Sequence, residues 1–215
     1  MVYDQAISKS ILSLAGLTAL QQSIMNLGMG ILMVQGRINS FGVNVMAAFS
    51  SAVKIDTLAY SPVQDFGNAC STFVAQNYGD RIKQGNRQAS WWILAFCLVI
   101  SSLVVFWAKP LLALFSSDPE VIQIGIGYLR IEGSFYALIG FLFMFYGYFR
   151  AIDEPMISVV LTIFSLGTRV LLAYLLSAVP SIGYIGIWAS IPIGWALADL
   201  AGLYYLHKKA VKPAD

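Results

Sequence analysis

Three ionisable residues lie deep inside long apolar stretches of this 215-residue chain: Asp65, Arg169 and Asp199. At 1.5 Å per helical residue, Asp65 lies ~18 Å from the polar end of its stretch, near Asn77, and so close to the centre of a bilayer. Such residues are costly in a membrane and often mark a path for protons, ions or substrates. Uptake and release of a proton is the chemistry expected of these carboxyl groups. A buried structural pair of Arg169 with Asp65, Glu132 or Asp199 would explain the same residues without that role.

Uncharged polar residues form a face on two neighbouring apolar stretches. In the first stretch, Thr18, Gln22 and Asn26 recur every four residues, with Gln21 beside them. Polar groups in lipid need partners, so the two faces predict a shared wet cavity, and hydrogen bonding between helices without a cavity is the alternative. The polar face of the second stretch consists of Ser61, Gln64, Asp65, Asn68, Ser71 and Thr72. The candidate cavity residues are Gln22, Asn26, Gln64, Asp65, Asn68, Arg169 and Asp199.

Other charged residues fall closer to the ends of their stretches. Lys54 and Asp56 are expected near the outer boundary, where charge costs little, and Glu132 just inside it. Pro62 lies within the second stretch and predicts a helix kink over residues 57–61, because it removes a backbone hydrogen bond.

Motifs of metal, nucleotide and nucleophilic chemistry are absent from the sequence. It contains no HExxH, CxxC, GxxxxGK[ST] or GxSxG pattern. The sole histidine, His207, lies in a basic tail and is expected to anchor the chain at the membrane interface. The sequence therefore predicts no enzyme, no metal and no organic cofactor. A net charge of +2 on so apolar a chain also argues against nucleic acid as a partner.

The composition explains which elements position these residues. Hydrophobic residues make up 58% and charged residues 11% of the chain, with a mean hydropathy of +0.73, whereas soluble domains carry about 25% charged residues. The lipid bilayer is the solvent that suits such a chain. A bilayer core of ~30 Å needs ~20 apolar residues per helix, and backbone groups in lipid must bond within their own segment. We expect an all-α integral membrane protein.

Six transmembrane helices are expected in one domain, residues 1–215. Their approximate ranges are 9–39, 42–77, 91–108, 121–149, 156–179 and 184–206, with a short amphipathic stretch at 111–115. Both termini are expected to be cytoplasmic, because this orientation places most basic residues inside. The inside set is Lys9, Arg81, Lys83, Arg87, Arg150, Lys208, Lys209 and Lys212, against Arg37 and Lys109 outside. The sixth helix also carries a stripe of small residues that predicts close packing within the bundle or with a second bundle, namely Ser190, Gly194, Ala198 and Gly202.

Several segments, in order along the chain, resemble the multidrug and toxic compound extrusion (MATE) family. They are GLTALQQS at 16–23, VQGRINSFG at 34–42, FGNACSTFVAQNYG at 66–79, YLRI at 128–131, FRAIDEP at 149–155 and GYIGIWA at 183–189. Family members have about twelve helices in two six-helix lobes. The resemblance implies that this chain is the C-terminal lobe, whether as a fragment, an isolated domain or a product that pairs with a matching N-terminal six-helix lobe.

By resemblance, the complete transporter would sit in the bacterial inner membrane and exchange H⁺ or Na⁺ for small cationic amphiphilic compounds. Sodium-coupled members carry acidic residues in the first and fourth helices of this half. The matching positions here, Gln21–Ser23 and Leu138–Gly140, have none. Another branch places its coupling carboxylate in the N-terminal lobe. Asp65 falls where the family is usually uncharged. We hypothesise that the main cation site lies in the other lobe, with Asp65 assisting.

Two other functions compete with an antiporter lobe. A lipid-linked oligosaccharide flippase of the same superfamily would need a strongly cationic cavity, and Arg169 is the only deep basic residue. A non-transporting membrane assembly subunit is the third reading, since a single lobe has no cleft that could alternate between two sides. A membrane enzyme is the least favoured, because no catalytic cluster is available.

Overall fold

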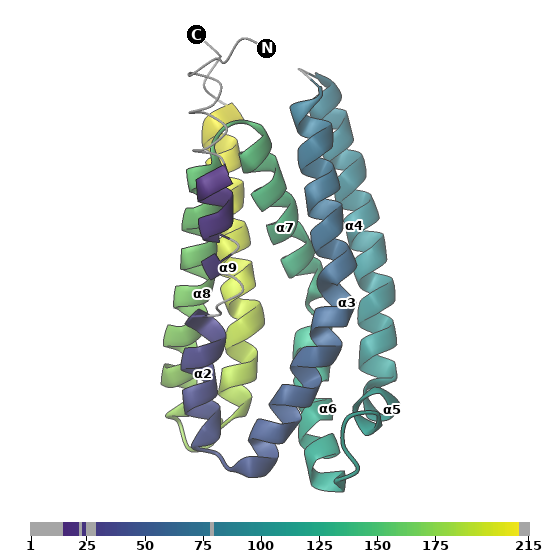
Figure 1. Cartoon of the computed structure of the whole chain (residues 1–215), viewed down its shortest axis with the longest axis vertical. Coiled ribbons are helices and arrows are strands. Elements are labelled where there is room, and N and C mark those ends of the chain that lie inside the picture. The colour runs from purple at the N-terminus through teal and green to yellow at the C-terminus, as the bar shows by residue number, and fades with distance from the viewer. Residues whose placement is uncertain (1–14, 22, 25–28, 78–79, 211–215) are drawn as a thin grey trace, which may run out of the picture.

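The computed structural model describes residues 15–21, 23–24, 29–77 and 80–210, and these residues form helices and short connections without a strand. Short helical segments precede α2 within residues 15–24. The labelled helices run in the following order (Figure 1): α2 (Met29–Asn39), α3 (Val43–Ala75), α4 (Asp80–Phe106), α5 (Ala108–Ala113), α6 (Pro119–Gly133), α7 (Tyr136–Ala151), α8 (Pro155–Ser177) and α9 (Ile185–Ala210).

The helices α8 and α9 match the predicted membrane spans closely, and α4 covers the third span but begins eleven residues earlier. Within the described residues, α4, α8 and α9 are each long and apolar enough to cross a bilayer, and α6 with α7 forms a fourth candidate. The more polar α3 has 33 residues, so it extends about 50 Å at 1.5 Å per residue. The first predicted span, about 9–39, is described only in part. The all-helical membrane fold predicted from the sequence is confirmed.

The fourth predicted span is one helix in the sequence reading but two in the structure. α6 ends at Gly133 and α7 begins at Tyr136, with a bend of 51° between them. At the break, the Ser134 hydroxyl donates to the carbonyl oxygen of Arg130 at 2.6 Å, and the Phe135 amide bonds back to Glu132 at 3.0 Å. Such side-chain bonds compete with the regular helical ladder. The span predicted over 121–149 therefore consists of two helices joined at a bend.

The ends of the helices agree with the predicted charge asymmetry. The start of α4, the end of α7 and the end of α9 lie together at the upper end of the bundle in Figure 1. These segments contain Arg81, Lys83, Arg87, Arg150 and Lys208. The end of α2, which carries Arg37, and the short helix α5, which carries Lys109, lie at the opposite end.

Helix α7 is the centre of the bundle, because it packs against α3, α4, α8 and α9. Figure 1 shows α8, α9 and α2 grouped on one side and α3 and α4 on the other. The crossing of α3 and α7 is made by two glycines. A Cβ atom on Gly67 would lie 2.7 Å from the carbonyl oxygen of Phe143, and one on Gly147 would lie 3.1 Å from the carbonyl carbon of Gly67. Only residues without a side chain allow this backbone contact.

The small-residue stripe of α9 packs inside this bundle, as the first of its two interpretations predicts. Ser190 and Ala198 are fully buried. A Cβ atom on Gly194 would approach the carbonyl oxygen of Ser165 in α8 to 3.0 Å, and one on Gly202 would meet the ring of Phe145 in α7 at 2.8 Å. Small residues allow α9 to lie directly against both helices.

Candidate functional site: a polar cavity inside the lobe

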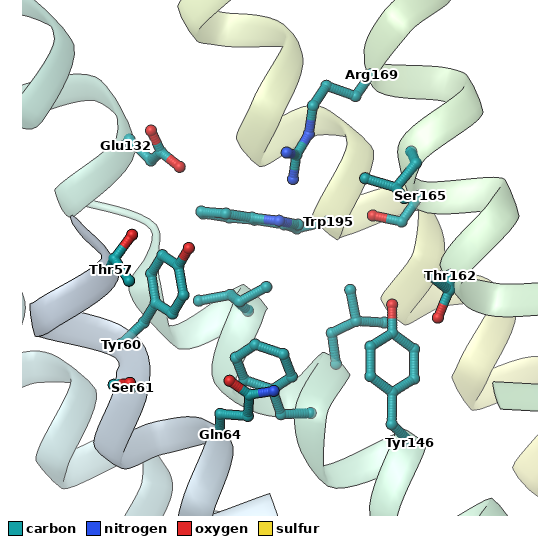
Figure 2. A pocket seen from close by; sticks show the side chains of 14 residues that line it. Thr57, Tyr60, Ser61, Gln64, Glu132, Tyr146, Thr162, Ser165, Arg169 and Trp195 are labelled. Carbon is teal, nitrogen blue, oxygen red and sulfur yellow. The ribbon is translucent and has the colours of Figure 1, made fainter. Parts of the chain in front are cut away.

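A cavity of about 200 Å³ lies inside the bundle, between α3 and α6 on one side and α8 and α9 on the other, with α7 forming its floor (Figure 2). Because α3 and α8 approach it from opposite groups of helices, residues about 100 positions apart face each other across it. The lining residues are Thr57, Tyr60, Ser61, Gln64, Glu132, Ile139, Leu142, Phe143, Tyr146, Thr162, Ser165, Leu166, Arg169 and Trp195.

Arg169 supplies the positive charge of this cavity. Figure 2 shows its side chain reaching from α8 toward Trp195, with Glu132 on the opposite wall. The guanidinium carbon lies 5.7 Å from the centroid of the Trp195 ring, within the range of a cation–π contact. The Nε atom of Arg169 is buried without a hydrogen-bond partner. The guanidinium therefore packs against an aromatic ring, and its Nε–H has no acceptor among the described residues.

Two carboxyl groups meet beside the cavity, at the break between α6 and α7. Asp56 is 2% exposed and Glu132 is 4% exposed. The hydroxyl of Tyr136, in the first turn of α7, donates to Oδ1 of Asp56. Glu132 and Tyr128, both on α6, also lie close to Asp56. The break in the helix thus directs Glu132 and Tyr136 at the same side chain of α3.

The remaining polar wall comes from α3 and α8. Ser61 and Gln64 lie along the α3 side, and Thr162 and Ser165 along the α8 side. Thr162 accepts a hydrogen bond from Nε2 of the buried Gln21 at 3.1 Å. The helical segment that precedes α2 therefore supports the cavity wall through Gln21.

The predicted site residues divide between several places. Gln64 and Arg169 line the cavity. Asn68 lies farther along α3, where its Oδ1 accepts from Nη2 of Arg150 at 3.0 Å, and both border a separate depression that Thr18 also lines. Asp65 is exposed and is not among the residues lining either hollow. Gln22 and Asn26 lie outside the described residues.

Asp199, a cavity candidate from its depth in the sequence, is buried in the bundle. It is 7% exposed, one helical turn beyond Trp195, and neither carboxylate oxygen has a hydrogen-bond partner. Its carboxyl lies outside the cavity lining.

The sequence reading underestimated Asp56. It was expected at the outer boundary of the membrane, where charge costs little, but neighbouring helices enclose it almost completely. One signal was available: Asp56, Tyr60 and Gln64 recur every four residues and therefore share one face of α3. The polar face read from Ser61 onward in fact begins one turn earlier. The contribution of Glu132 depends on the break in the helix, which the sequence reading missed.

Within the described part of the chain, no group of three or more His, Cys, Asp or Glu side chains is placed to hold a metal ion.

Apolar helices long enough to cross a bilayer, packed around an internal cavity, are the features of a multi-pass membrane protein. The chain belongs to the multidrug and toxic compound extrusion family, since the MatE family model matches residues 15–175. This membership confirms the resemblance read from the sequence segments, and it places the chain in the inner membrane.

Two curated relatives show the range of names within this family. The chain is 30% identical over 176 residues to a protein named FAD transporter from Shewanella oneidensis, covering 79% of this chain and 38% of that protein. It is 28% identical over 170 residues to the probable multidrug resistance protein YoeA from Bacillus subtilis, covering 76% of this chain and 36% of that one. The chain thus spans less than half the length of these relatives.

Solved structures match the fold over nearly the whole chain. An outward-facing MATE family transporter of the MOP superfamily superposes with a TM-score of 0.89 at 24% identity, covering 97% of this chain and 48% of that structure. A MOP superfamily transporter from Pyrococcus furiosus gives a TM-score of 0.88 at 24% identity, with the same coverage. The bundle described here therefore has the fold of about half of such a transporter.

Proposed function

We propose that this chain forms the C-terminal six-helix lobe of a secondary active antiporter, which exports small cationic amphiphilic compounds in exchange for H⁺ or Na⁺. The observation that carries this proposal is the cavity within the bundle in which Glu132 and Arg169 lie on opposite walls (Figure 2). An acidic group in a polar cavity between membrane helices is a place where a coupling cation can bind and leave.

The size of the cavity favours a cation over a drug as its occupant. Pockets for drug-sized ligands have volumes of ~300–1,000 Å³, whereas this cavity measures about 200 Å³. We therefore assign the drug to the cleft between two lobes and the coupling ion to the interior of a lobe. A matching N-terminal six-helix lobe is the partner that this arrangement needs, because alternating access requires one bundle to rock against another.

The charges of the cavity favour an antiporter over a flippase. A cavity that holds a pyrophosphate should be strongly cationic, but here the carboxyl of Glu132 opposes Arg169. The proposal involves no covalent chemistry on the substrate and no organic cofactor.

Coupled exchange is testable in proteoliposomes that contain the chain joined to an N-terminal lobe of a relative. We expect an imposed H⁺ or Na⁺ gradient to drive a cationic dye such as ethidium against its concentration gradient. The reason is that the cation and the dye bind the carrier alternately and favour opposite states of it. Dissipating the gradient with an ionophore should stop the movement. Dye movement that is insensitive to both gradients would contradict the antiport mechanism.

A further inference from the structure

The carboxyl pair Asp56 and Glu132 has unused binding capacity. Oδ2 of Asp56 and Oε2 of Glu132 are buried, and neither atom has a hydrogen-bond partner. Both side chains are more than nine-tenths buried, and Glu132 borders the cavity. Buried polar atoms are nearly always partnered in folded proteins. These two oxygens therefore indicate a ligand that satisfies them.

Two carboxylates cannot both stay charged in this environment without a cation. They lie close enough to interact directly, and two neighbouring buried carboxyl groups can form a hydrogen bond only when one of them carries a proton. Repulsion between two like charges is strong where water is excluded, because the effective dielectric constant is low. A proton shared by the pair, or a metal cation between them, removes this repulsion.

The charges of the side chains around Asp56 and Glu132 determine which ion the pair can bind. Tyr128 on α6, Tyr136 on α7 and Tyr60 on α3 face the pair and are neutral hydroxyls, and Arg169 on α8 is the cation within electrostatic range of both carboxyls. Two carboxylates and one guanidinium leave one negative charge. One monovalent cation neutralises that charge, and carboxylate and hydroxyl oxygens are suitable ligands for a hard cation.

We propose that Asp56 and Glu132, with the hydroxyl of Tyr136, form a binding site for one monovalent cation, H⁺ or Na⁺, within this lobe. The site joins the second and fourth predicted spans. It differs from the positions at Gln21–Ser23 and Leu138–Gly140, where sodium-coupled members carry their acidic residues and this chain carries none. Its role in coupling rests on the proposed function, whereas cation binding itself does not.

The test measures cation binding through thermal stability of the detergent-purified chain. Melting is followed by fluorescence as Na⁺ replaces choline at constant ionic strength, and separately as the pH is lowered. A ligand that binds only the folded state raises the melting temperature. Asp56→Asn and Glu132→Gln each remove one carboxyl of the site at nearly constant volume. Their matched controls are Asp153→Asn and Glu120→Gln, which alter exposed carboxyls, and Asp153 has a positive φ that asparagine tolerates.

Asp199 is the other buried carboxyl among the described residues, so every variant is also measured in an Asp199→Asn background. Tyr136→Phe provides a milder variant, because it removes one hydroxyl and keeps both carboxyls.

We expect the melting temperature of the unmodified chain to rise with Na⁺, with acid, or with both. Each carboxyl variant should weaken Na⁺ binding by at least about tenfold or abolish the response to acid, while the exposed controls keep the response. A response to Na⁺ identifies a sodium site, and a response to acid alone identifies a proton site. The proposal is overturned if the unmodified chain responds to neither, or if both carboxyl variants respond as it does. Loss of dye exchange with an intact cation response would count against the proposed function alone.

Discussion

Leucine in place of Gly147 is expected to remove the folded protein from detergent extracts of membranes. The α3 and α7 backbones touch at Gly67 and Gly147, so an added side chain must force two helices apart instead of displacing a flexible side chain. Overpacking in a well-packed interior costs about 1–3 kcal/mol or more, and this backbone-to-backbone contact belongs at the upper end. Because α7 packs against four helices, the damage should spread through the bundle.

Size-exclusion chromatography of a fluorescent fusion measures this loss as a missing monodisperse peak. Gly167→Leu is the matched control, because a Cβ atom on Gly167 in α8 would meet no atom within 4 Å. That variant should elute as the unmodified chain does. An unchanged peak from Gly147→Leu would show that the α3–α7 crossing is looser than the structure indicates.

Glu132→Gln is expected to reduce gradient-driven dye exchange by at least about tenfold and to flatten its pH dependence. The reason is that the proposed cation site needs both carboxyl groups, and the variant leaves only that of Asp56. The same assay separates the two candidate acids of this chain. Asp65 is exposed and borders neither described hollow, so Asp65→Asn should have a smaller effect at every pH.

The opposite ranking, with exchange lost in Asp65→Asn and kept in Glu132→Gln, would restore Asp65 as the assisting acid. It would also place the exchange outside the cavity of Figure 2. Membrane expression of both variants is measured in parallel, so that a loss of protein is not counted as a loss of transport.

Much of the fold could be predicted from the sequence because lipid imposes a simple rule. Long apolar segments must become helices, and their ends follow from charges, prolines and glycines. The ranges of α8 and α9 were therefore close to those expected, whereas α4 begins eleven residues before the expected start at 91. The break after Gly133 was harder to predict from the sequence. It lies within a long apolar stretch, and it is marked only by local hydrogen bonds of Ser134 and Phe135.

The site was harder to predict than the fold, because its residues meet only after folding. The position of a charged residue along one helix gives its distance from water and so the expected free-energy cost of its charge. By that measure the charge of Asp56 was expected to cost little. Its actual enclosure comes from α6 and α7, which begin more than 60 residues later in the chain. The sequence singles out Arg169 by its depth and Gln64 by the polar face of its stretch, and both line the cavity. The pairing of Asp56 with Glu132, by contrast, required the bend between α6 and α7.

The most direct test of this account is drug resistance in an efflux-deficient bacterial strain. Three cultures are compared: cells that express this chain alone, cells that express it joined to a matching N-terminal six-helix lobe, and cells with an empty vector. Membrane insertion is verified in the first two. An antiporter lobe predicts resistance only from the joined form, because alternating access needs two bundles. Resistance from the chain alone, or from neither form, would contradict it.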